Sequence, residues 1–176
     1  IMKTILCFSR SYLANLLSEL GKKDKDHEYL HIVQTKEELR LIEAKGEKVI
    51  LCLENIVKDG MMKVNKNIKF NEPDDFRKVT NFFWSPIMTD RYISYYDKEK
   101  REKIATLLFN AIEELFNKYK FDYFMSEPVA LFSAQIMFYF SKKSGTQVRV
   151  WSPCYFPGYF YFSSNFRMLI IVISNF

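Results

Sequence analysis

The sequence predicts an α/β fold in which helices cover both faces of a mostly parallel sheet. Two observations predict it. Short apolar runs alternate with amphipathic helical patterns along most of the 176 residues, and the spacing of the first three runs suits right-handed crossover connections. The composition agrees, because 48% hydrophobic residues can form a sizeable core and only 5 Gly and 5 Pro disfavour a protein made of many tight turns. We expect a three-layer sandwich with five or six strands in the order 3-2-1-4-5.

The first three strands and two helices are expected in the first third of the chain. Apolar runs predict strands over Lys3–Phe8, Tyr29–Gln34 and Glu47–Glu54, the last of them buried on both faces. The first helix carries leucines on one face and is expected to end at Gly21. The second begins after Thr35, because Glu38 three residues later completes a capping box, and it ends at Gly46.

The alternation continues after a less regular stretch from Asn55 to about Tyr96, in which residues 74–84 form a helix. Asp97 is expected to cap a long amphipathic helix over Lys98–Lys118. The remaining predicted elements are a strand over Phe121–Ser126, a helix over Val129–Ser144 that ends at Gly145, and a strand over Gln147–Trp151.

The last residues differ from the rest in composition. Tyr155–Phe162 is strongly aromatic, so it can stack on sugar, touch a membrane surface or pack against another domain. Met168–Ile173 is an apolar run. We assign residues 1–162 to one domain and residues 163–176 to an apolar tail. That tail either packs as a final strand, lacks its normal partner surface, or is truncated or non-native sequence.

Several functional classes lose support from composition alone. A net charge of +5 is modest and spread along the chain, so we expect no nucleic-acid groove, although attraction to anionic substrates or membranes stays compatible. Three cysteines without CxxC spacing indicate a reducing cytoplasm. No apolar run is long enough to span a bilayer, so a soluble protein is expected. Dinucleotide and P-loop motifs are missing and His27 and His31 lack metal spacing, so we expect no cofactor and no metal.

Candidate site residues follow the first and fourth strands. In the expected order these strands are neighbours at the switch point, where ligands bind outside the strand ends. Their carboxyl ends place a cation, hydroxyl groups and a carboxylate around one crevice: Ser9, Arg10, Ser11, Ser126 and Glu127. Two helix N-termini point into this crevice and favour an anion such as phosphate.

Each of these residues also has a structural interpretation. Glu127 can stabilise the start of the following helix through its dipole. Arg10 can be a solvated loop cation or a structural partner of Glu127, and Ser11 is an ordinary N-cap residue. Asp90 and Arg91 precede several tyrosines, so this pair either binds substrate or ties the irregular stretch to the sheet.

The second half of the chain resembles a known family. The resemblance covers about residues 90–162 and rests on Asp90-Arg91, the helix Lys98–Lys118, the segment Phe121–Glu127, the apolar helix after it, and Val148–Gly158. These segments resemble the amino-terminal half of capsule polysaccharide biosynthesis proteins, which are GT-B-type glycosyltransferases. The resemblance implies two Rossmann-like domains, an acceptor-binding first half, to which this chain corresponds, and a nucleotide-sugar-binding second half.

The resemblance also implies roles for individual residues. Glu127 is the candidate general base that accepts the proton of an acceptor hydroxyl. Arg10 holds anionic groups, and Trp151 and Tyr155 stack on sugar. The other expected substrate-binding residues are Ser9, Ser11, Arg91 and Ser126.

The partners follow from the same resemblance. They are a glycan acceptor and, through a missing second domain or a partner subunit, a nucleotide sugar, so the isolated chain is expected to be inactive. The expected location is the cytoplasm, with peripheral contact at the inner face of the membrane.

Two other functional classes stay open. The fold also suits a non-catalytic flavodoxin-like or receiver-like binding module. A phospho-acceptor receiver is disfavoured, because Ser9-Arg10-Ser11 supplies no acidic cluster after the first strand. The third interpretation is a membrane-surface scaffold that uses the aromatic segment near the end of the chain.

Overall fold

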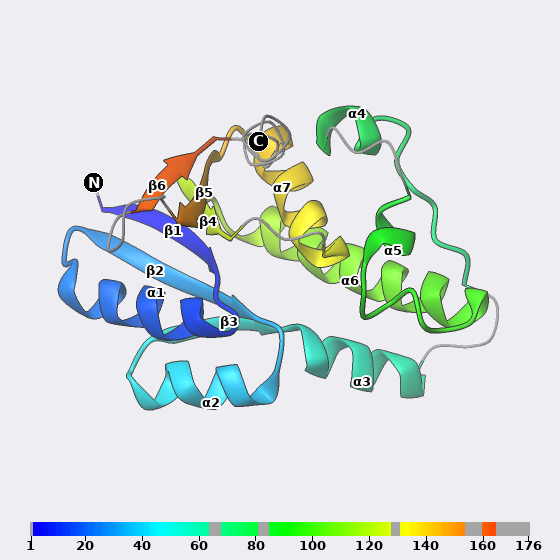
Figure 1. Cartoon of the computed structure of the whole chain (residues 1–176), viewed down its shortest axis with the longest axis horizontal. Helices are drawn as coiled ribbons and strands as arrows, with labels where there is room; N and C mark the ends of the chain where they lie inside the picture. The colour runs from blue at the N-terminus through cyan, green and yellow to red at the C-terminus, as the bar shows by residue number, and fades with distance from the viewer. Residues whose placement is uncertain (1, 64–67, 81–84, 128–130, 154–159, 165–176) are drawn as a thin grey trace.

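The computed structural model contains one six-stranded sheet with the order β3-β2-β1-β4-β5-β6 (Figure 1). It describes residues 2–63, 68–80, 85–127, 131–153 and 160–164. The strands are β1 (Lys3–Phe8), β2 (His27–Val33), β3 (Lys48–Cys52), β4 (Tyr123–Ser126), β5 (Gln147–Pro153) and β6 (Phe160–Ser163). All neighbouring strands are parallel except β5 and β6, which are antiparallel. The predicted fold class and the order 3-2-1-4-5 are therefore confirmed, with β6 added at one edge.

Helices cover both faces of this sheet, as the alternation of side chains along β1 requires. Ile5 and Cys7 pack with α1, whereas Leu6 and Phe8 belong to the main core formed with α6 and α7. The helices are α1 (Tyr12–Lys23), α2 (Lys36–Ala44), α3 (Leu53–Lys63), α4 (Phe76–Thr80), α5 (Pro86–Thr89), α6 (Lys98–Lys118) and α7 (Phe132–Ser144). Figure 1 shows α1 and α2 together on one side, with α6 and α7 on the other.

Local signals placed several helix ends correctly. The capping box of Thr35 and Glu38 is present at the start of α2, and the Asp97 side chain accepts a hydrogen bond from the N–H of Lys100 in α6. Gly145 follows α7 with φ = 76°, a left-handed conformation that favours glycine. These three ends were predicted because each depends on residues next to one another in the chain.

The prediction that the first helix ends at Gly21 was wrong, since α1 continues to Lys23. A Cβ at Gly21 would lie 2.6 Å from a carboxylate oxygen of Glu47 and 3.3 Å from the Cβ of Tyr29. The glycine therefore allows α1 to approach the sheet closely. It does not end the helix.

The third strand also differs from the prediction. It is the edge strand of the sheet and is mostly half-buried, not buried on both faces, because it pairs only with β2. The chain then enters α3 directly, where an irregular stretch was expected. The side chains of Leu53, Val57 and Met61 pack on the main core from this helix.

Helix α7 begins later than predicted, at Phe132 instead of Val129. The predicted helix over residues 74–84 is observed as α4, and residues 81–84 lie outside the described residues. The apolar run over residues 168–173 also lies outside them, so the assignment of the tail stays a prediction. Among the described helices, none combines the length and the apolar character that crossing a membrane requires.

Candidate functional site

The centre of the site is an ion pair at the switch point of the sheet. Arg10 follows β1 and Glu127 follows β4, and these two strands are paired in parallel. Nη1 of Arg10 donates to Oε1 of Glu127 at 2.7 Å, and the two side chains are only 10% and 11% exposed. The predicted cation and carboxylate are therefore in direct contact. Arg10 is a structural partner of Glu127, which is one of the two interpretations that the sequence left open.

The alternative in which Glu127 caps the following helix does not agree with the structure. The N-cap of α7 is Leu131, four residues further along, and it makes no side-chain capping hydrogen bond. Instead, Oδ2 of Asp90 accepts a hydrogen bond from the N–H of Phe132 at 2.8 Å. The carboxylate at this helix end thus comes from a distant part of the chain.

An aromatic pair lies beside the ion pair. Tyr12 lies near Glu127, and partial burial, followed by the negative charge of this carboxylate, raises the pKa of Tyr12 to about 12. Tyr12 is 51% exposed, and its ring centroid is 5.4 Å from that of Trp151. Trp151 therefore lies close to the ion pair, but within β5 and not at its end, because the strand continues to Pro153. It lines neither of the two hollows described below, so its stacking on sugar stays a prediction.

The backbone around Arg10 is fixed by a carboxylate from α2. Ser11 has φ = 52°, which is uncommon for a residue other than glycine. Its N–H donates to Oε1 of Glu38 at 2.7 Å, while Oε2 of Glu38 accepts from the N–H groups of Gln34 and Thr35 at 2.9 Å. Ser11 does occupy the N-cap position of α1, but its side chain makes no capping hydrogen bond.

Two of the predicted substrate-binding serines are enclosed. Ser9 is fully buried, and its hydroxyl lies 2.7 Å from Nδ1 of His31. Ser126 is buried too, and its hydroxyl donates to the carbonyl oxygen of Glu127 at 2.9 Å. In this conformation both side chains support the strand ends and do not line a hollow.

His31 received no role from the sequence, yet it lies directly beneath the site. Burial lowers the pKa of His31 to about 4. A carboxylate oxygen of Glu47 is 3.7 Å from its Nε2, which is too far for a hydrogen bond, so burial dominates and the imidazole is neutral near pH 7.

Next to the ion pair lies a hollow of about 560 Å³, here called the polar hollow. Its lining includes charged and amide side chains of both signs: Arg10, Asn15, Gln34, Glu37, Glu38 and Arg91. Nε of Arg10 donates to Oε1 of Gln34 at 3.1 Å, and the guanidinium of Arg91 lies over the ring of Tyr92. The structure thus brings Arg91, predicted from a distant motif, to the same hollow as Arg10 and Ser11.

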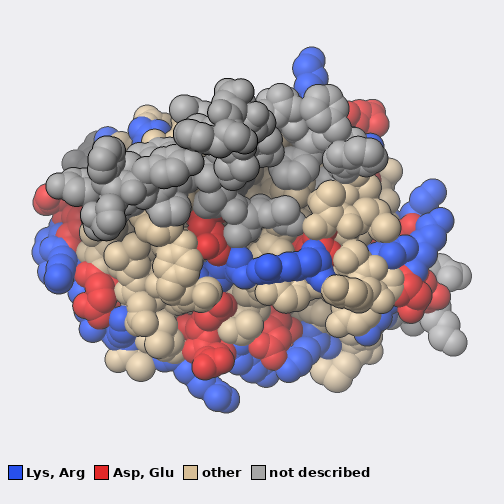
Figure 2. Space-filling view, in the orientation of Figure 1, with Lys and Arg blue, Asp and Glu red and all other residues tan. Residues whose placement is uncertain are grey.

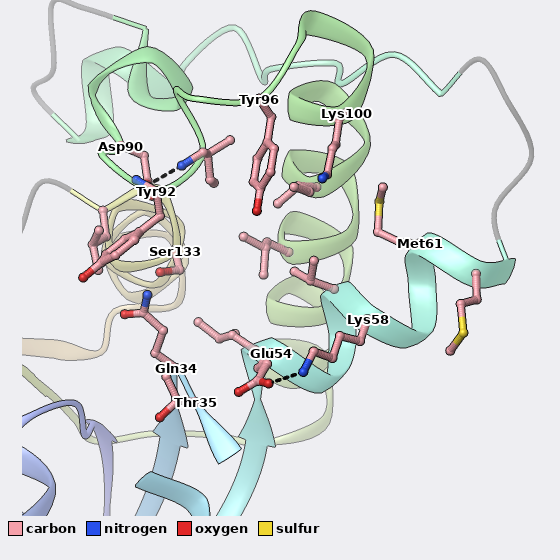
Figure 3. A pocket seen from close by; sticks show the side chains of 17 residues that line it. Gln34, Thr35, Glu54, Lys58, Met61, Asp90, Tyr92, Tyr96, Lys100 and Ser133 are labelled. Carbon is pink, nitrogen blue, oxygen red and sulfur yellow. Dashed lines mark hydrogen bonds and ion pairs between the residues drawn. The ribbon is translucent and has the colours of Figure 1, made fainter. Parts of the chain in front are cut away.

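A second hollow of about 740 Å³, the apolar hollow, adjoins the first and shares Gln34, Thr35 and Tyr92 with it. Its apolar walls come mainly from α3 and α6 and include Leu53, Val57, Met61, Ile104 and Leu108. Figure 3 shows Gln34 and Ser133 on one side of this hollow and Met61 and Lys58 on the other.

Asp90 holds the segment that carries Arg91 of the polar hollow and Tyr92, which lines both hollows. Its Oδ1 accepts hydrogen bonds from the N–H groups of Tyr92 and Ile93 at 2.8 and 3.1 Å, and its Oδ2 from that of Phe132. Asp90 is buried. The sequence left open whether Asp90-Arg91 binds substrate or ties the irregular stretch to the fold. Asp90 makes the structural contacts, whereas Arg91 lines the polar hollow.

Other predicted features are not all within the described residues. Tyr155 lies outside them, so its role stays a prediction. Within the described ranges, no cluster of three or more His, Cys, Asp or Glu side chains is arranged to hold a metal ion. On the face shown in Figure 2, the described acidic and basic side chains are interspersed and form no continuous stripe of one sign.

Sequence reasoning missed Gln34, Tyr12 and the apolar hollow. Gln34 could have been found, because it follows β2 as Arg10 follows β1, and neighbouring parallel strands end at the same edge of the sheet. The apolar hollow had no local signal, since it depends on how α3 packs against α6.

Comparison with models of known protein families gave no match, and a search among curated proteins gave no significant match either.

Proposed function

We propose that this chain is the acceptor-side domain of a GT-B-type glycosyltransferase that builds capsular or other cell-surface polysaccharide. The observation that supports it most is the polar hollow beside the Arg10–Glu127 pair, at the carboxyl ends of β1 and β2. A nucleotide sugar is then bound by a second domain or a partner subunit, and the acceptor lies in this domain.

The lining of the polar hollow suits an uncharged, hydroxyl-rich ligand. Sugar hydroxyls both donate and accept hydrogen bonds, so they need carboxylates, guanidinium groups and amides together. The hollow offers all three, through Glu37, Arg91 and the amides of Asn15 and Gln34. The ring of Tyr92 adds an apolar surface on which a sugar ring can lie.

An anionic acceptor group, which the sequence suggested, has less support. The charge of Arg10 is balanced by Glu127 at 2.7 Å. Two further carboxylates, those of Glu37 and Glu38, line the same hollow with Arg91. Since the positive charges are matched by negative ones, a phosphate gains little there, and we propose a neutral sugar instead.

Glu127 is the proposed general base. Its carboxylate is held on one side by Arg10, and Tyr12 lies beside it. Glu127 is buried and lines neither hollow, so we propose that the half-exposed Tyr12 beside it moves aside and an acceptor hydroxyl reaching out of the polar hollow donates to this carboxylate. That hydroxyl then attacks the anomeric carbon of the donor, its proton passes to Glu127, and the nucleotide leaves.

Binding tests the acceptor assignment on the chain alone. Neutral oligosaccharides are titrated and followed by NMR, and we expect signals from Gln34 and Tyr92 to shift. Gln34→Leu should weaken binding at least about tenfold, whereas Lys36→Leu, an exposed neighbour outside the hollow, should not. Equal binding by both variants, or tighter binding of a nucleotide sugar than of any oligosaccharide, contradicts the assignment.

Turnover tests the base. In the enzyme assembled with its donor-binding half, Glu127→Gln should lower the rate of sugar transfer by about 10²–10⁴ with little change in acceptor affinity. An unchanged rate removes Glu127 from the mechanism. Sugar transfer by the chain alone refutes the proposal that a donor-binding half is required.

A further inference from the structure

We infer that the apolar hollow binds an alkyl chain attached to the sugar that occupies the polar hollow, so that the ligand of this domain is an amphipathic, uncharged glycoside. The inference deepens the proposed function and rests on it for the sugar half. The alkyl half rests on the apolar hollow itself.

The first argument is the continuity of the two hollows. They share Gln34, Thr35 and Tyr92 in their linings, so one ligand can pass from one to the other along these side chains. The volumes, about 560 and 740 Å³, each fall within the range of small-molecule sites. A sugar without an apolar substituent would leave the larger of the two unfilled.

The second argument is the chemistry of the apolar walls. The floor of the hollow consists of buried core side chains, among them Leu53, Ile104 and Leu108, while Met62 is 78% exposed at its edge. Methionine is flexible and adapts to apolar ligands of different shape. An alkyl chain gains from these surfaces without needing any hydrogen bond.

The third argument is that the charged groups of this hollow are already engaged. The carboxylate of Glu54 accepts from the N–H of Lys36 at 2.9 Å and from Nζ of Lys58 at 2.5 Å (Figure 3). Nζ of Lys100 lies 3.7 Å from the ring centroid of Tyr96. Since Asp90 is likewise committed to backbone N–H groups, these groups leave an environment that favours an uncharged, apolar occupant.

The test uses hexyl, octyl and decyl glucosides below their micelle concentrations, titrated into the whole chain by calorimetry. We expect affinity to rise about fourfold for each added methylene, which corresponds to ~0.8 kcal/mol. Val57→Trp fills the hollow from α3 and should weaken octyl glucoside at least about tenfold. Leu16→Trp, on the exposed part of α1 outside both hollows, is the matched control and should change nothing.

A second measurement needs no variant. In protein labelled with ¹³C at the methionine methyl groups, octyl glucoside should shift the signals of Met61 and Met62 and leave that of Met2 unchanged. Affinity that is independent of chain length, or unchanged Met61 and Met62 signals, overturns the inference.

The same measurements distinguish failure of the proposed function from failure of this inference. If octanol binds as tightly as octyl glucoside and remains sensitive to Val57→Trp, the chain site stands and the sugar site is lost. If free oligosaccharides bind and chain length has no effect, the sugar site stands and the inference falls.

Discussion

Removing Arg10 should destabilise the fold strongly, because it leaves the carboxylate of Glu127 buried without its cation. A buried pair that loses one partner costs about 3–5 kcal/mol. The side chains of Arg10 and Glu127 are 10% and 11% exposed, and the hydroxyl-bearing side chain of Tyr12 stays near the carboxylate, so we expect Arg10→Met to cost ~3 kcal/mol. This corresponds to roughly a hundredfold change in the folding equilibrium.

Two further variants separate the ion pair from simple loss of packing. The double variant Arg10→Met/Glu127→Leu removes both charges and should lie within ~1 kcal/mol of the original chain. Lys48→Ala breaks an exposed pair with Glu28, whose atoms are 3.7 Å apart and whose side chains are 59% and 41% exposed, and should cost less than ~1 kcal/mol.

The assay is urea unfolding at pH 7, followed by tryptophan fluorescence, to which Trp151 near the site contributes. The reasoning is refuted if Arg10→Met costs no more than Lys48→Ala. It is refuted equally if the double variant costs the sum of Arg10→Met and Glu127→Leu measured singly, since the coupling between the charges would then be zero.

Three other predictions concern the groups around the hollows. Burial lowers the pKa of His31 from 6.5 to about 4, so the unfolded chain binds a proton at His31 more tightly than the folded chain does. The free energy of unfolding should therefore fall by up to ~3 kcal/mol as the pH falls from 6.5 to 4. His31→Gln should remove this part of the pH dependence of the urea midpoint. Asp90→Ala takes the acceptor from three backbone N–H groups and should cost ~2 kcal/mol by urea unfolding, against almost nothing for the exposed Asp74→Ala; equal losses contradict the anchoring role. Glu38→Ala likewise leaves three N–H groups without their acceptor and should cost ~2 kcal/mol by urea unfolding. A comparable loss in the exposed neighbour Glu37→Ala would show that removing any negative charge from the first turn of α2 explains the effect, and would contradict a specific role of Glu38.

The parts of the fold that the sequence predicted are those with local causes. Four of the six residues of β1, Ile5 to Phe8, form an apolar run, and the start of α2 follows from Thr35 and Glu38, three residues apart. The strand order follows from the general topology of such sheets, and that order alone predicts Arg10 and Glu127 at neighbouring strand ends.

The parts that the sequence did not predict depend on contacts between distant segments. Gly21 resembles a helix end, yet the approach of Glu47 and Tyr29 explains it. The carboxylate at the start of α7 comes from Asp90, 42 residues earlier, so the nearby Glu127 was the wrong candidate. The apolar hollow requires α3 to lie against α6, and no pattern within α3 specifies that partner.

The three hydrogen bonds of Glu38 have a consequence for how the rim of the site opens. One carboxylate fastens the loop after β1, at Ser11, and the loop after β2, at Gln34 and Thr35. Neither loop can detach while the first turn of α2 stays folded. In a hydrogen-exchange experiment these three amides should therefore become labelled together, with one shared opening free energy. A substitution on the outer face of α2 that loosens its first turn would then alter ligand access from a distance.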